Sequence, residues 1–94
     1  MNTNRFELLH PEGKQGGTID RQKYETMKTA ILACVQAHGE ISFTELVDQI
    51  KEQIGDTFDG SIPWYVTTVK LDLEARGILE RFKKNQRQCI RVRG

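Results

Sequence analysis

The sequence predicts a small α+β domain in which three helices precede a C-terminal β-hairpin. A serine or aspartate stands where each helix would begin, and a glycine follows where each helix would end. The last segment alternates apolar and basic residues, as a half-buried strand does. With 94 residues the chain has the size of one domain. We expect an N-terminal arm over residues 1–19, strand-like or extended, and the domain itself over residues 20–94.

The composition is that of an ordinary globular domain. Hydrophobic residues make up 37% of the sequence and charged residues 29%. The longest apolar run, around Ala30–Val35, is far shorter than the roughly 20 residues that cross a bilayer. The first residues contain no apolar segment of the kind that directs secretion. We therefore expect a cytoplasmic protein that makes no membrane contact.

The residue types that commonly form catalytic, metal or cofactor sites are few and lie far apart in the sequence. Cys34 and Cys89 lie far apart, and the sequence contains neither a CxxC nor an HxxxH spacing. We expect both cysteines to be reduced and buried. Phosphate-binding glycine motifs are missing, and no nucleophile lies in a context that would activate it. The sequence therefore predicts no catalytic residue, no metal, no cofactor and no enzymatic activity.

The first helix is predicted to begin after Asp20 and to end before Gly39. An aspartate carboxylate accepts hydrogen bonds from the open N–H groups of a first helical turn. Glycine readily adopts the left-handed conformation that commonly terminates a helix. Between these two residues, one stripe recurs with helical spacing and consists of Tyr24, Met27, Ile31, Cys34, Val35 and His38.

The second helix has the strongest local start signal in the chain. Ser42 and Glu45 have the spacing of a capping box, in which each side chain bonds an open backbone N–H. Ile41 and Leu46 occupy the positions of the accompanying hydrophobic staple. This helix should start directly after Ser42 and end near Gly55. We also expect Ile41 to add one strand rung beside the later hairpin.

The third helix is predicted over residues 62–76. Ser61 supplies its cap, and Pro63 occupies the first turn, where a missing N–H loses no hydrogen bond. Gly77 ends the helix. The hairpin that follows has predicted strands at residues 78–84 and 88–93, joined by a tip at residues 85–87.

Charge is distributed unevenly along the chain. Residues 76–94 hold seven lysines and arginines against Glu80 alone, a local charge of +6, whereas residues 1–75 carry −5. A cationic end on a nearly neutral chain is typical of proteins that face a polyanion. The alternative is a solvated hairpin that is basic without binding a ligand.

Two stretches resemble the winged helix-turn-helix superfamily. One is the capped start at residues 41–46. The other is residues 69–81, which contain the pattern leucine, glutamate, two residues, glycine and two apolar residues. The resemblance covers residues 20–93 and implies three helices followed by a β-hairpin called the wing. The chain also looks like a small uncharacterised bacterial family of winged-helix proteins, in its arm, Pro11-x-Gly13-Lys14, and its helix start, Lys23-Tyr24-x-x-Met27.

The resemblance implies binding to double-stranded DNA, with the third helix in the major groove and the wing along the backbone. It implies a DNA-binding protein, such as a small bacterial transcriptional regulator, whose basic wing contacts phosphates. The residues then expected to contact nucleic acid are Lys70, Thr67 and Thr68 on the helix and Arg81, Lys83, Lys84, Arg87, Arg91 and Arg93 on the wing.

The outward face of the third helix departs from that of a standard DNA reader. The apolar stripe of this helix that is expected to face the core consists of Ile62, Val66, Val69 and Leu73. At about 100° per residue, the side chains opposite this stripe are those of Trp64, Thr68, Leu71 and Ala75. Residues 62–75 contain no arginine, asparagine or glutamine that could bond base edges. Asp72 and Glu74 would lie near phosphates and be repelled. The residues of the third helix therefore support DNA binding less well than the basic residues of the wing do.

The apolar outward face favours a second hypothesis, a protein-interaction or homodimerisation module without sequence-specific DNA binding. Its candidate interface residues are Trp64, Leu71, Phe6 and Leu8. The arm residues among them are expected to pack on their own domain or on a partner chain. The sequence leaves open whether the arm or a second copy of the chain covers the face.

Overall fold

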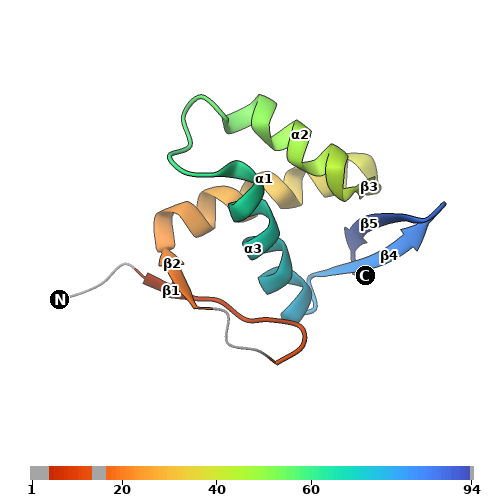
Figure 1. Cartoon of the computed structure of the whole chain (residues 1–94), viewed down its shortest axis with the longest axis horizontal. Coiled ribbons are helices and arrows are strands. Elements are labelled where there is room, and N and C mark those ends of the chain that lie inside the picture. The colour runs from red at the N-terminus through yellow and green to blue at the C-terminus, as the bar shows by residue number, and fades with distance from the viewer. Residues whose placement is uncertain (1–4, 14–16, 94) are drawn as a thin grey trace.

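The computed structural model of the chain describes residues 5–13 and 17–93, which form three helices and two antiparallel sheets (Figure 1). The predicted α+β class is therefore confirmed. In chain order the elements are β1 Arg5–Glu7, β2 Thr18–Asp20, α1 Arg21–His38, β3 Glu40–Ser42, α2 Phe43–Ile54, α3 Ile62–Ala75, β4 Leu79–Lys84 and β5 Arg87–Val92. The rest of the predicted arm, residues 1–4 and 14–16, lies outside the described residues, as does Gly94.

The arm forms a small antiparallel sheet of its own. β1 pairs with β2, so that Phe6 lies opposite Ile19. The Phe6 ring also stacks on Tyr24 of α1, with ring centroids 3.7 Å apart. Of the two alternatives for the start of the arm, the strand is confirmed. Its partner β2 has only three residues and gave no periodic signal in the sequence.

The three predicted helix caps are confirmed. In each case a backbone N–H of the first turn donates to the side chain of the capping residue. These bonds run from Lys23 to Asp20 at 3.1 Å, from Glu45 to Ser42 at 3.2 Å and from Trp64 to Ser61 at 3.4 Å. The helix starts are therefore determined by short-range chemistry that the sequence displays.

α3 ends in a Schellman motif, which leads the chain directly into the hairpin. The N–H of Gly77 donates to the carbonyl of Glu74 at 3.1 Å, and the N–H of Ile78 donates to that of Leu73 at 3.0 Å. Gly77 has a φ of 78°, which a side chain would disfavour. Because only residues 76–78 separate α3 from β4, this ending helps to set the direction of the hairpin relative to the helix.

β3, β5 and β4 form a three-stranded antiparallel sheet with β5 in the centre. Ile41 lies opposite Ile90, so the predicted strand rung is confirmed. The hairpin turns at Asn85 and Gln86, whose φ angles of 53° and 67° fit a two-residue type I′ turn. Arg87, predicted as part of the tip, instead begins β5, because this turn needs only two residues.

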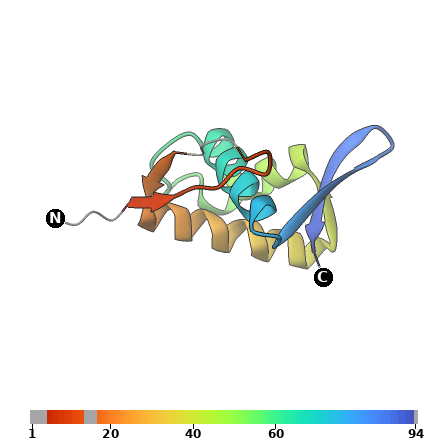
Figure 2. The same cartoon turned by 90° about the horizontal axis from the view of Figure 1, so that it is seen from below.

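The core lies where the three helices meet the sheet. Fully buried side chains come from every layer and include Met27 of α1, Leu46 of α2, Leu73 of α3 and Ile90 of β5. Figure 2 shows α1 and α3 lying one against the other, with the β4–β5 hairpin extending beyond them. Residues 83–88, around the hairpin turn, are all exposed. The fold therefore separates a packed helical body from a projecting, cationic hairpin.

The two cysteines, Cys34 and Cys89, are free and buried, as predicted. Burial raises the pKa of the Cys34 thiol, because a thiolate would lose its hydration there. Among the described residues, no three or more His, Cys, Asp or Glu side chains are grouped to hold a metal ion. Over the same ranges, no helix combines the length and the apolar character that crossing a bilayer requires.

Candidate nucleic-acid interface

The β4–β5 hairpin and the residue after it carry six of the side chains expected to contact nucleic acid, and three of these are paired with acids. Nε of Arg81 lies 3.8 Å from Oε1 of Glu74. Nζ of Lys84 lies 2.5 Å from Oε2 of Glu40, and Nε of Arg91 lies 2.5 Å from Oε2 of Glu80. The hydrogen bond to Glu40 raises the pKa of the Lys84 ammonium. Two of the three acids belong to other elements, so the +6 counted along the sequence overstates the local field.

The other three cations are Lys83, Arg87 and Arg93, and all are exposed. None has an ion-pair partner within residues 5–13 and 17–93. An unpaired surface cation can bind an anion without first breaking an internal contact. The attraction of the hairpin for a polyanion is therefore concentrated in these three side chains.

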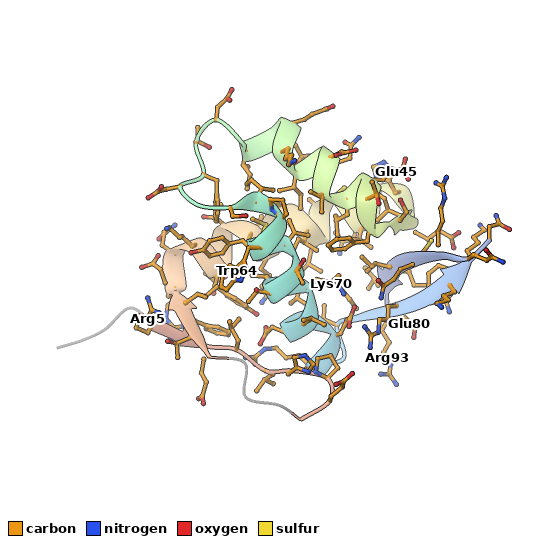
Figure 3. The ribbon with its side chains drawn as sticks, viewed as in Figure 1. Arg5, Glu45, Trp64, Lys70, Glu80 and Arg93 are labelled. Carbon is orange, nitrogen blue, oxygen red and sulfur yellow. The ribbon has the colours of Figure 1, made fainter. Side chains whose placement is uncertain are left out.

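Lys70 does not face outward, contrary to the prediction. The residue is only 4% exposed, and its ammonium donates a 2.7 Å hydrogen bond to Glu74 one turn further along α3. The same nitrogen lies 5.7 Å from the centre of the Phe43 ring on α2. Figure 3 shows Lys70 on the side of α3 that faces the three-stranded sheet. The expectation that Lys70 contacts nucleic acid is therefore wrong, because its charge is already used inside the fold.

Asp72 is fully buried rather than exposed beside phosphates. Its carboxylate accepts hydrogen bonds from the Tyr24 hydroxyl at 2.6 Å, the Leu9 N–H at 2.8 Å and Nε of Arg76 at 2.8 Å. Burial and the bond to Asp72 raise the pKa of the Tyr24 phenol. The same carboxylate raises the pKa of Arg76. One buried acid thus joins the arm, α1 and α3.

Glu74 is also withdrawn from the surface. Its side chain is 5% exposed and lies between Lys70 of α3 and Arg81 of β4. With Asp72 buried as well, neither acid of α3 is placed to repel a phosphate, which corrects the sequence-based expectation. The contact between Glu74 and Arg81 also ties the hairpin to the helix.

The outward face of α3 is left uncharged. Trp64 is 52% exposed, and the partly exposed side chains on its face are Thr67, Thr68, Leu71 and Ala75. The Trp64 ring meets the Tyr65 ring edge-on at 4.9 Å, and Tyr65 meets Phe58 in the same way at 4.9 Å. Helical counting correctly placed Trp64, Thr68, Leu71 and Ala75 on this face. The aromatic cluster beneath Trp64 holds the loop before α3 against the helix.

Two of the four residues proposed for a protein interface are engaged within the chain. Leu8 is buried in the core, and Phe6 stacks on Tyr24 while the guanidinium of Arg76 lies 4.9 Å from the Phe6 ring. The arm therefore packs on its own domain, and the expectation that Phe6 and Leu8 form an interface with a second chain is corrected. The other two proposed interface residues lie on the outward face of α3, where Trp64 is exposed and Leu71 is partly exposed.

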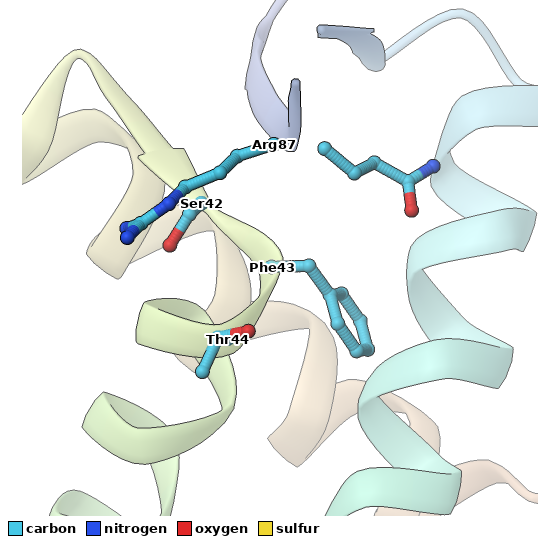
Figure 4. Close-up of a pocket in the computed structure, with 5 residues that line it drawn as sticks. Ser42, Phe43, Thr44 and Arg87 are labelled. Carbon is cyan, nitrogen blue, oxygen red and sulfur yellow. The ribbon is translucent and has the colours of Figure 1, made fainter. Parts of the chain in front are cut away.

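A cavity of about 470 Å³ opens between the first turn of α2 and strand β5 (Figure 4). The residues that line it are Ser42, Phe43, Thr44, Arg87 and Gln88. A neighbouring cavity of about 400 Å³ is lined by Arg81, Phe82, Lys83 and Gln88. Gln88 lines both cavities, so Arg87 borders the first hollow and Lys83 borders the second.

Sequence reasoning missed the inward-facing pairs of α3 and the two cavity residues Phe43 and Gln88. The pairs had a visible signal, since Lys70 with Glu74 and Asp72 with Arg76 both have the i,i+4 spacing of helical ion pairs. Gln88 had no such signal in the sequence, because its position at the cavity depends on how the hairpin lies against α2.

The chain belongs to a protein family of unknown function, DUF6958, whose model matches residues 5–89. The matched range begins at β1 and ends within β5, so it includes the arm, the three helices and most of the hairpin. Comparison with curated proteins and with solved structures gave no match.

Proposed function

We propose that the protein binds double-stranded DNA through its basic hairpin, on a winged-helix scaffold. The scaffold assignment is supported by the element order α1–β3–α2–α3–β4–β5 and by the central position of β5 in the sheet. In such a domain α3 is the helix that enters the major groove, and the β4–β5 hairpin is the wing. The role that fits this binding is that of a small bacterial transcriptional regulator acting in the cytoplasm.

The observation that carries this proposal is the set of three exposed cations, Lys83, Arg87 and Arg93, that have no ion-pair partner in the described part of the chain. Lys83 and Arg87 lie near the hairpin turn, and Arg93 follows β5 at the base of the hairpin, where its N–H donates to the carbonyl of Ile78. Neutralising phosphates releases condensed counterions, and this release supplies most of the affinity for DNA of any sequence. Arg81, Lys84 and Arg91 add a weaker contribution, because each must share its charge with an acid of the protein. Contacts of this kind position a protein on DNA without reading its sequence.

The neutral face of α3 supports the same proposal. With Asp72 and Glu74 inside the fold, a helix approaching the groove meets no like-charge repulsion. Thr67 and Thr68 remain on the approachable side and offer hydroxyl groups to phosphates. DNA can therefore contact the helix and the wing together.

A titration of a labelled duplex at low salt tests the proposal. We expect a dissociation constant of roughly 1–100 µM, the range of contacts made mainly to the backbone, and a steep weakening as salt is added. Absence of binding up to about 100 µM protein at low salt would reject DNA binding. Binding that is indifferent to salt would reject the phosphate mechanism.

A second candidate function, homodimerisation or another protein contact, is favoured by the exposure of Trp64 beside Leu71. Exposed aromatic residues on a firm base are common at the centres of interfaces. The test is the mass in solution of the wild type and of Trp64→Glu, measured over a range of concentrations. A dimer that the substitution dissociates supports this candidate, and a wild type that stays monomeric throughout rejects homodimerisation.

A further inference from the structure

We propose that the outward face of α3 reads the 5-methyl groups of thymine in the major groove. This inference rests on the proposed DNA binding and adds the chemical feature of the DNA that the helix would recognise.

The chemistry of this face limits what it can recognise. Its side chains, from Trp64, Thr67, Thr68, Leu71 and Ala75, present ring carbons, methyl groups and two hydroxyls. The charged residues of the same helix, Lys70, Asp72 and Glu74, are buried and bonded to other protein groups. Bidentate hydrogen bonding to guanine or adenine is therefore outside the reach of the helix. The apolar group that base edges offer in the major groove is the thymine methyl.

Charge complementarity indicates duplex DNA as the occupant of this face. Only residues 76–78 connect α3 to β4. Arg81 of β4 also lies 3.8 Å from Glu74 of α3. The unpaired cations Lys83 and Arg87 are thus carried by a hairpin fixed to the same helix. A polyanion bound by the hairpin lies beside α3, and the major groove of B-DNA, about 12 Å wide, admits an α-helix.

Trp64 is held in place before any ligand arrives. Tyr65 meets it edge-on, and Phe58 meets Tyr65 in turn, with centroid distances of 4.9 Å in both pairs. Gly60 lies so close that a Cβ there would be 2.7 Å from Cε2 of Tyr65, so the loop packs tightly on this cluster. A side chain that is already ordered loses little entropy on binding. Trp64 is therefore the residue on which most of the methyl contact is expected to depend.

The same chemistry predicts discrimination between nucleic acids. Uracil lacks the methyl group, and the major groove of A-form RNA is too deep and narrow for a helix. Duplex DNA containing thymine should therefore be preferred to duplex RNA of the matching sequence.

The experiment compares duplexes of one length at one salt concentration by fluorescence anisotropy. The first contains A·T pairs, and the second carries deoxyuridine at every thymine, which removes only methyl groups. A third and a fourth contain G·C pairs with cytosine or with 5-methylcytosine, which restores a methyl in the groove. We expect the thymine duplex to bind roughly three- to tenfold more tightly than the deoxyuridine duplex, since each buried methyl contributes a factor of a few. The 5-methylcytosine duplex should likewise exceed the cytosine duplex.

Two variants localise the effect. Trp64→Ala should abolish the difference between the thymine and deoxyuridine duplexes while leaving a salt-dependent affinity from the hairpin. Val92→Ala is the matched control, because it shortens an exposed apolar residue of the sheet and should keep the difference. Circular dichroism verifies that both variants fold.

The outcomes separate the two proposals. Equal binding to the thymine and deoxyuridine duplexes would overturn methyl reading and leave hairpin binding intact. A difference that persists in Trp64→Ala would also overturn it, since the preference would then arise elsewhere. Failure of every duplex to bind at low salt would overturn the proposed function itself.

Discussion

The ammonium of Lys70 donates a 2.7 Å hydrogen bond to Oε2 of Glu74, and both side chains are buried between α3, α2 and the sheet. This bond removes the one lysine of α3 from the surface and neutralises one of its two acids. Asp72, the other acid, is neutralised by Arg76 in the same helical register. α3 therefore presents an uncharged outward face, and the DNA-binding proposal assigns phosphate contact to the hairpin.

The Lys70–Glu74 pair should be strongly coupled in stability. Glu74→Ala should cost about 3 kcal/mol, because it leaves a buried ammonium without its partner. The double variant Lys70→Met/Glu74→Leu should recover most of this loss, since apolar residues often replace a buried ion pair at little cost. Urea unfolding measures both free energies. A double variant that is less stable than Glu74→Ala would contradict the coupling. DNA affinity should rise slightly in both variants, because the loss of Glu74 frees Arg81 from its acid partner.

Asp72 should stabilise the attachment of the arm as well as the helices. Asp72→Asn is expected to lower the free energy of unfolding by about 3 kcal/mol, because it weakens the bonds to Tyr24, Leu9 and Arg76 together. Asp48→Asn, at an exposed position of α2, is the matched control and should stay within about 0.5 kcal/mol.

Amide hydrogen exchange distinguishes this local role from a general loss of stability. The Leu9 N–H should exchange faster in Asp72→Asn by more than the global destabilisation explains, because its acceptor is the altered group. Unchanged relative protection of Leu9 would show that Asp72 does not hold the arm.

The Tyr24 phenol should make the fold sensitive to alkali. Its pKa is raised by burial and by the bond to Asp72, so the folded state favours the protonated form. Its contribution to stability is complete below the pKa of an unfolded tyrosine, about 10, and falls as the pH rises above that value. Urea midpoints measured at increasing pH should therefore decline above about pH 10, and less steeply in Tyr24→Phe. Equal declines in the two proteins would contradict this assignment.

Lys83 and Lys84 offer a matched comparison within one strand. Lys83 has no ion-pair partner in the described part of the chain, whereas Lys84 bonds Glu40 at 2.5 Å. Lys83→Gln should weaken DNA binding at all sequences and reduce the salt slope by about 1. Lys84→Gln should have the smaller effect, because its charge is shared with an acid. Anisotropy titrations at several salt concentrations measure both, and a larger effect at Lys84 would contradict the role assigned to pairing.

Local chemistry explains why much of the fold was predictable. The caps at Asp20, Ser42 and Ser61 and the glycine ending at Gly77 depend on residues within one turn, and all four were located from the sequence. The strand rung at Ile41 was expected from the resemblance to winged domains, and in the structure Ile41 pairs with Ile90 of β5.

The missed features depend on distant partners. Asp72 accepts bonds from Leu9, 63 residues away, and from Tyr24, 48 residues away. Asp72 was expected near phosphates, because the sequence contains no information that the arm would cover this residue. The pairing of Lys84 with Glu40 was hidden for the same reason, since it spans 44 residues. The charge pattern of the hairpin could thus be counted from the sequence, but its neutralisation could not.

The slope of the DNA-binding constant against salt concentration tests the central claim most directly. If Lys83, Arg87 and Arg93 each neutralise one phosphate, the logarithmic slope for the wild type should be about −3 or steeper. The variant with glutamine at all three positions should lose most of this slope and most of its affinity at low salt, while its unfolding curve stays close to that of the wild type. A triple variant that binds DNA with an unchanged slope would contradict the claim that these unpaired cations hold the DNA.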